Sequence, residues 1–147
     1  MCKDKQLIIR LLPKKPEITF YSVSNEEVKA SIDSYFMKLK RSLVDSEYFY
    51  TTEWGIREAV TYVREVYPFP KYVPEVMDCD DFAMLMKALV ASEFGINDFW
   101  IVFGDSPEGY HAFNMARVED RYVIIEPQLG TVFEVYENGY VPRECYL

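Results

Sequence analysis

Apolar residues recur about once per helical turn in the chain that follows residue 24. Ser24 is followed by Glu27 three residues later, which is the arrangement of a capping box at the start of a helix. The pattern predicts an amphipathic helix over residues 25–46. Its apolar positions are Val28, Ile32, Phe36, Leu39 and Leu43. A short strand is expected just before this helix, over residues 17–23.

Two further helices are predicted. Thr51 or Thr52 can cap the first of them, whose apolar positions lie about one turn apart until Pro68 ends it. Asp78 can cap the next one, and Gly95 is placed to end it in the left-handed conformation. The proline-containing stretch between these two helices is expected to be an extended loop.

After Gly95 the apolar period changes from about 3.6 residues to 2, which is typical of strands. Strands are expected over residues 99–103, 110–118, 122–126 and 132–136. Helices that precede a run of strands favour an α+β fold. We therefore expect N-terminal helices, a central helix that carries Cys79, and a four-stranded, mainly antiparallel sheet.

Composition and charge narrow the class of protein. The chain has 147 residues, half of them apolar, which suits a single domain over residues 1–147. Its net charge of −8 repels phosphate backbones and disfavours nucleic-acid binding. No apolar run is long enough for a membrane helix, and Leu7–Leu12, interrupted by Arg10, is too short for a secretory signal. The expected protein is soluble and cytoplasmic, without a membrane partner, and its oligomeric state stays open.

The three cysteines, Cys2, Cys79 and Cys145, are odd in number and lack the paired spacing of zinc ligands. Neither a disulfide framework nor a structural zinc site is expected. Cys79 differs from the others because it begins a predicted helix, where the helix dipole favours a thiolate. The neighbouring aspartates oppose this effect by repulsion. The alternative role of Cys79 is that of a small buried apolar residue.

His111 is the only histidine, and it suits a base near neutral pH. A two-residue turn at residues 119–120 would set a hairpin register that places Phe113 opposite Glu126 and His111 opposite Gln128. These four side chains then share one face of the hairpin. Glu126 becomes a diagonal neighbour of His111, where a carboxylate can fix the imidazole tautomer and stabilise its charged form. Gln128, directly opposite His111 in this register, can form a further hydrogen bond with it.

A helix start and two neighbouring strands thus supply a cysteine, a histidine and a glutamate in that order. The segments are Asp78-Cys79-Asp80-Asp81-Phe82-Ala83, Gly109-Tyr110-His111-Ala112-Phe113-Asn114 and Ile125-Glu126-Pro127-Gln128. Together they resemble the papain-like and transglutaminase-like cysteine peptidases, in particular small bacterial and phage members and the C-terminal peptidase domain of a fungal agglutinin. The resemblance implies that Cys79 is the nucleophile, His111 the base and Glu126 the orienting acid.

The sequence departs from papain itself around the cysteine. No glutamine occurs between Gln6 and Gln128, so the glutamine that helps to form the papain oxyanion hole has no counterpart. The Cys-Gly-Ser-Cys-Trp signature is absent as well. The oxyanion would need the backbone N–H of Cys79 and a second donor, for which Tyr72 is a candidate.

The three aspartates around Cys79 raise the question of a bound cation. Clustered oxygen ligands suit calcium or magnesium. The resemblance to the agglutinin domain, which depends on calcium, allows such an ion here, with Gln128 as a further ligand. Alternatively, Asp78 caps the helix while Asp80 and Asp81 favour its N-terminus. The second interpretation is favoured because no EF-hand spacing occurs, so no cofactor is expected to be required.

These residues favour a thiol-dependent hydrolase that acts on an amide bond of a peptide or protein substrate. One alternative is a transferase that passes the acyl group to an amine. The other is a catalytically inactive binding protein of the same fold, such as a viral interaction protein.

Overall fold

The computed structural model describes residues 12–35, 37–40 and 42–146. In chain order the elements within these residues are β1 (Phe20–Ser24), α1 (Asn25–Ser34), β2 (Lys38–Leu39), β3 (Glu47–Thr51), α2 (Glu53–Val66), α3 (Cys79–Phe94), β4 (Phe99–Ser106), β5 (Gly109–Val118), β6 (Arg121–Glu126), β7 (Thr131–Glu134), the 3-10 helix η1 (Glu137–Gly139) and β8 (Val141–Tyr146). Cys2, Phe36 and most of Leu7–Leu12 lie outside them. Of the helices in the described chain, none has the length and apolar character needed to cross a bilayer.

The second and third predicted helices are confirmed together with their caps. Helix α2 follows Thr52, whose side chain accepts a hydrogen bond from a backbone N–H of the first turn. Helix α3 begins at Cys79, behind a capping box formed by Asp78 and Asp81. It ends at Gly95, which has a φ of 69° and adopts the left-handed conformation that glycine accepts at low cost.

The first predicted helix is much shorter than its apolar pattern indicates. Ser24 caps it as expected, but α1 ends at Ser34, so the prediction of a helix to residue 46 is wrong. In the chain that follows, Lys38 and Leu39 form β2 and pair in parallel with β8. Pairing with a distant strand therefore overrides a local helical periodicity.

The sheet contains eight strands within the described residues, so the predicted number of four is wrong. Its main path runs β1-β3-β5-β4-β8-β2, and β6 pairs with both β5 and β7. The pairs β2–β8 and β3–β5 are parallel, and the others are antiparallel. Strand β2 has two residues and β8 contains Pro142, so neither gives a clear strand pattern. The α+β class and the mainly antiparallel sheet are confirmed.

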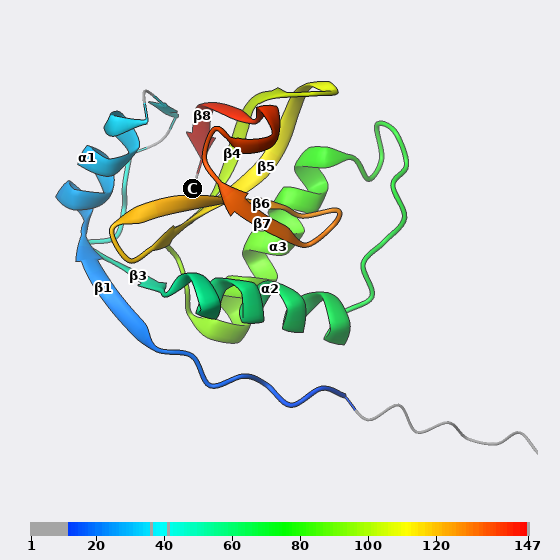
Figure 1. The fold of residues 1–147 in the computed structure, drawn as a ribbon, viewed down its shortest axis with the longest axis horizontal. Coiled ribbons are helices and arrows are strands. Elements are labelled where there is room, and N and C mark those ends of the chain that lie inside the picture. The colour runs from blue at the N-terminus through cyan, green and yellow to red at the C-terminus, as the bar shows by residue number, and fades with distance from the viewer. Residues whose placement is uncertain (1–11, 36, 41, 147) are drawn as a thin grey trace, which may run out of the picture.

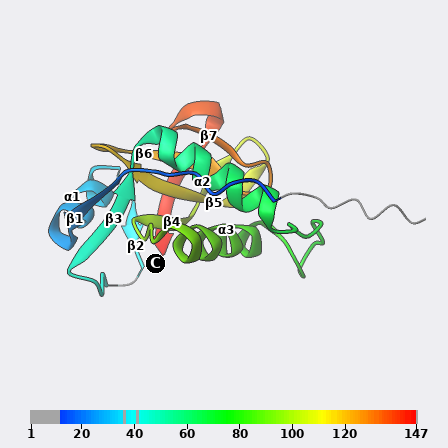
Figure 2. The same cartoon turned by 90° about the horizontal axis from the view of Figure 1, so that it is seen from below.

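Two apolar cores lie on the opposite faces of β5 and β6, because successive side chains of a strand alternate. Ala116 and Val123 belong to the core that α2 and α3 cover. Met115 and Ile124 belong to the core that α1 covers. Figure 1 and Figure 2 show α2 and α3 beside each other, with α1 at a separate end of the sheet next to β1 and β3.

Arg117 of β5 forms a buried ion pair and also links α1 to the sheet. Nε of Arg117 lies 2.7 Å from Oδ2 of Asp98, whose side chain is fully buried. The other oxygen of Asp98 accepts hydrogen bonds from Trp100 Nε1 at 2.7 Å and the Tyr122 hydroxyl at 2.6 Å. Arg117 also donates to Ser31 Oγ of α1 at 2.7 Å. The buried charge is thus fully paired.

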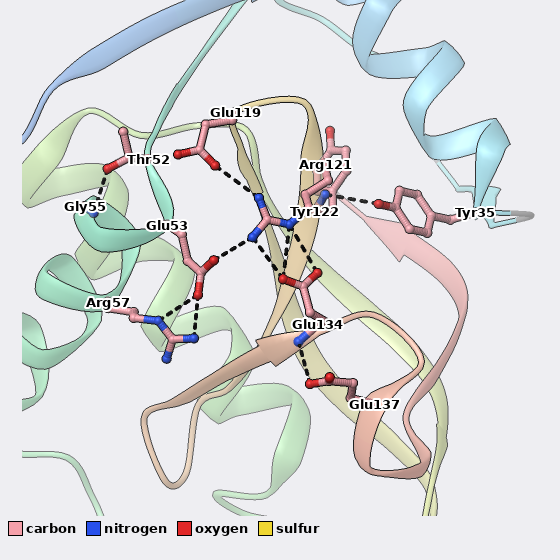
Figure 3. A network of polar contacts seen from close by, with 10 residues as sticks. All are labelled: Tyr35, Thr52, Glu53, Gly55, Arg57, Glu119, Arg121, Tyr122, Glu134 and Glu137. Carbon is pink, nitrogen blue, oxygen red and sulfur yellow. Dashed lines mark hydrogen bonds and ion pairs between the residues drawn. The ribbon is translucent and has the colours of Figure 1, made fainter.

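Arg121 at the start of β6 joins three elements (Figure 3). Its guanidinium lies 2.5 Å from a carboxylate oxygen of Glu53 in α2, 3.1 Å from Glu119 in the turn, and 2.9 Å from Glu134 in β7. Arg57 pairs with the other oxygen of Glu53 at 2.6 Å. This network fixes the tip of the β5–β6 hairpin against α2, and the same hairpin carries His111 and Glu126.

Candidate active site

The β5–β6 hairpin has the predicted turn and register. Its pairs include Val118 with Arg121 and Asn114 with Ile125. The ladder between β5 and β6 stops at the pair of Asn114 with Ile125, so the predicted pairings of Phe113 with Glu126 and of His111 with Gln128 do not form. The intervening Pro127 has no backbone N–H to continue the ladder. The backbone N–H of Gln128 instead turns back and donates to Glu126 Oε1 at 3.0 Å.

The structure brings the side chains of His111 and Glu126 into contact just beyond the end of this ladder. His111 Nε2 lies 2.8 Å from Glu126 Oε2, and Glu126 is 4% exposed. Burial raises the pKa of the Glu126 carboxyl, but the hydrogen bond from His111 and the backbone N–H of Gln128 outweigh it, so the net pKa lies below its ordinary value. Because an ionised carboxylate can only accept hydrogen bonds, Nε2 of His111 is the donor in its contact with Glu126.

Tyr140 is a member of this cluster that sequence reasoning missed. Its hydroxyl donates to Glu126 Oε2 at 2.9 Å, and its ring meets the His111 ring edge to face, with centroids 6.0 Å apart. Burial and the negative charge of Glu126 raise the pKa of the Tyr140 phenol, so it keeps its proton and remains a donor. Tyr140 lies between η1 and β8, where no local pattern marks it.

Cys79 and His111 line one pocket of about 430 Å³. The other residues that line it are Tyr72, Ser106, Glu108, Tyr110 and Gln128. Cys79 is partly exposed at the first position of α3. There is no hydrogen bond between the described side chains of Cys79 and His111. In enzymes without bound substrate, such contacts are often longer than in the complex. The arrangement places a reachable thiol and an oriented imidazole at the same opening.

Hydrogen-bond donors for an oxyanion are present at this pocket. As the first residue of α3, Cys79 has a backbone N–H with no intrahelical acceptor. Tyr72 and Gln128 also line the pocket, and Tyr72 is 53% exposed. The structure therefore places Tyr72, the residue predicted as a candidate for the second donor, at the same pocket as Cys79.

The aspartates around Cys79 have different surroundings. Asp81 Oδ2 accepts a hydrogen bond from the backbone N–H of Asp78 at 3.2 Å and so belongs to the helix cap. One ligand atom each of Asp78, Cys79 and Asp80 lie within 4.8 Å of one another. A hydrogen bond with Asp78 raises the pKa of the Asp80 carboxyl. Two carboxylates and a soft thiol do not by themselves fit calcium, which takes about six to eight oxygen ligands.

No protein-family model and no curated protein matches the sequence. Solved structures do match it. A PSL1a–E64 complex is 24% identical with a TM-score of 0.65, over 86% of this chain and 51% of that one. The fold is papain-like. The Polyporus squamosus lectin bound to a human-type influenza-binding epitope is 22% identical with a TM-score of 0.61, over 86% of this chain and 49% of that one.

The chain therefore spans about half the length of these two proteins. At this identity the similarity concerns the fold alone. Within the papain-like fold, α3 packs on the sheet through β4 and β5 and presents Cys79 at its first position.

Proposed function

We propose that this protein is a thiol-dependent hydrolase of amide bonds in a peptide or protein. Cys79 is the nucleophile, His111 the general base and Glu126 the acid that orients the imidazole. The observation that carries the proposal is the 2.8 Å contact between His111 Nε2 and Glu126 Oε2, beside a pocket that His111 shares with Cys79. The papain-like fold and the complex of PSL1a with E64 support it.

In the first half of the reaction, Nδ1 of His111 takes the thiol proton of Cys79. The sulfur forms a bond to the carbonyl carbon, and the carbonyl oxygen becomes an oxyanion that the Cys79 N–H stabilises. Glu126 stabilises the imidazolium through Nε2. The C–N bond then breaks, and the proton on Nδ1 passes to the leaving amine, so that an acyl thioester remains on Cys79.

In the second half, water replaces the amine in the pocket. His111 Nδ1 accepts a proton from this water as its oxygen attacks the thioester carbon. The C–S bond breaks, the proton returns to the sulfur, and the carboxylic acid product leaves. If an amine takes the place of water at this step, the same residues perform acyl transfer.

Thiol labelling tests the proposal. Native protein is treated with iodoacetamide at neutral pH, and the labelled peptides are quantified by mass spectrometry. Cys79 should react faster than in the urea-unfolded chain, whereas Cys145, whose pKa burial raises to about 12, should react slowly. His111→Ala should slow the labelling of Cys79 about tenfold or more and leave Cys145 unchanged.

Equal labelling of Cys79 in the native protein and in His111→Ala would exclude an activated thiol and leave an inactive binding protein. E64, an epoxide that alkylates thiols, provides a second probe. Its adduct should form on Cys79 in the native protein and fail to form in Cys79→Ser. Product analysis with an added primary amine then separates hydrolysis from transfer.

A further inference from the structure

Tyr140 and His111 bind the same carboxylate oxygen. Oε2 of Glu126 accepts a hydrogen bond from the Tyr140 hydroxyl at 2.9 Å and lies 2.8 Å from His111 Nε2. We propose that Tyr140 is a positioning residue, whose hydroxyl holds the Glu126 carboxylate in the orientation that presents Oε2 to the imidazole. This inference rests on the proposed function.

The ring of Tyr140 is held in place by aromatic neighbours. It meets Phe113 and Phe133 edge to face, with centroid separations of 5.2 Å and 5.0 Å. With the ring of His111 these contacts fix the direction of the hydroxyl. Edge-to-face pairs of this kind have a defined geometry. The hydroxyl is therefore a preorganised donor.

Gly104 allows the start of β8 to place Tyr140 close to Glu126. It pairs with His111 across β4 and β5, and the register between β4 and β8 shifts just before it. A Cβ at Gly104 would lie 2.1 Å from the carbonyl oxygen of Val141, the residue after Tyr140. Only glycine allows this close approach. The start of β8 thus lies beside His111 because residue 104 has no side chain.

Other charged or titratable groups face the cluster without replacing this donor. Arg64 of α2 lies near Glu126, but its Nη1 donates to the carbonyl oxygen of Pro127 at 2.6 Å. Cys79, Glu108 and Tyr110 line the same pocket as His111.

Among the described residues, the donors to Glu126 are His111, the Gln128 N–H and the Tyr140 hydroxyl. Loss of the Tyr140 hydroxyl leaves Oε2 with the imidazole alone. The Gln128 N–H then remains the only fixed donor to the carboxylate among the described residues, and it holds Oε1, so the position of Oε2 relative to His111 is less restricted.

The test compares Tyr140→Phe with the native protein. Because His111 is the only histidine, nitrogen NMR reports its tautomer without overlap. The native protein should show the tautomer with the proton on Nε2, and Tyr140→Phe should show a mixture. Labelling of Cys79 by iodoacetamide at pH 6.5 should slow about tenfold, the usual effect of losing a hydrogen bond to a charged group. In a plot of the Cys79 labelling rate against pH, the fall at low pH should begin at a higher pH in Tyr140→Phe than in the native protein.

Tyr146→Phe is the matched control, since its hydroxyl donates to Glu144 at 3.3 Å on the same strand, and it should behave like the native protein. A native tautomer and a native pH profile in Tyr140→Phe would overturn the inference and reduce Tyr140 to a packing residue. If Tyr140→Phe has the native tautomer and pH profile while Cys79 of the native protein labels fast and depends on His111, the proposed function stays intact. Slow labelling in the native protein together with a changed tautomer in Tyr140→Phe would overturn the proposed function and support the positioning role.

Discussion

The side-chain amide of Asn114 donates a hydrogen bond to the carbonyl oxygen of Ala83 at 3.0 Å. Asn114 is fully buried in β5, and Ala83 lies about one turn after Cys79 in α3. The same amide nitrogen donates to the carbonyl oxygen of Trp100 in β4 at 3.0 Å. Strand β5 also carries His111, so one strand holds the proposed base and anchors the helix that carries the proposed nucleophile.

Asn114→Ala should therefore affect both stability and reactivity. It removes the donor from two buried carbonyl groups, which lowers the free energy of unfolding by about 1–3 kcal/mol in a urea titration. Cys79 labelling should slow in the same variant, because α3 loses its tie to β5. Val90→Ala, a cavity mutation farther along α3, is the control: it should cost stability and leave labelling unchanged. Equal labelling in both variants would contradict this role.

Glu126→Gln should impair function more than stability. The amide keeps the shape and part of the hydrogen bonding but loses the charge that stabilises the imidazolium. The rate of Cys79 labelling, or the turnover of a peptide substrate, should fall about a hundredfold or more. The melting temperature should change by only a few degrees. A collapse of stability with retained reactivity would make Glu126 a structural partner instead.

Glu126 also makes a signed contribution to the dependence of stability on pH. Its pKa is lowered in the folded protein, so its stabilisation is present above the pKa of the unfolded chain and is lost as pH falls through the folded value. Urea titrations at several pH values below about 5 should show a smaller loss of stability in Glu126→Gln than in the native protein. Parallel curves for the two proteins would contradict the lowered pKa.

Arg117→Met should be strongly destabilising, by about 3–5 kcal/mol, because it leaves the charge of Asp98 buried without its cation. Adding Asp98→Asn removes that charge and should restore part of the loss. Urea unfolding of the two single variants and the double variant measures the coupling. Additive losses would show that the two side chains act independently.

Calcium should leave the melting temperature and the rate of Cys79 labelling unchanged if the aspartates only cap α3. A calcium ion bound to the folded state would add about 2.7 kcal/mol at a hundred times its dissociation constant. Thermal melts with calcium or with a chelator distinguish the two cases. A calcium-dependent rise in stability and labelling, lost in Asp80→Asn or Asp81→Asn, would show that the site holds a cation.

The contact between His111 and Glu126 could be predicted because it depends on a short hairpin. A two-residue turn and the alternation of side chains fix which residues are neighbours across fifteen residues of chain. Helix α3 could also be predicted from the sequence, because its capping residue Asp78 and its final Gly95 are local signals.

The errors arise where distant segments meet. The apolar positions after Ser34 suit a helix, yet Lys38 and Leu39 pair with β8. Tyr140 reaches Glu126 only because β8 lies beside β4, and no spacing in the sequence encodes that placement. Pairing across the whole chain competes with local periodicity, and a single sequence shows only the latter.

The parallel pairing of β2 with β8 also bears on the order of events during folding. Joining Lys38 to Glu144 closes a loop of about a hundred residues, whose entropic cost must be met before the pairing stabilises the chain. Contacts of such high sequence separation slow the rate of folding. Tyr140 directly precedes β8, so its bond to Glu126 forms with this late closure. During refolding, α3 and the β5–β6 hairpin should therefore appear first, and the reactivity of Cys79 should mature only with the slowest phase.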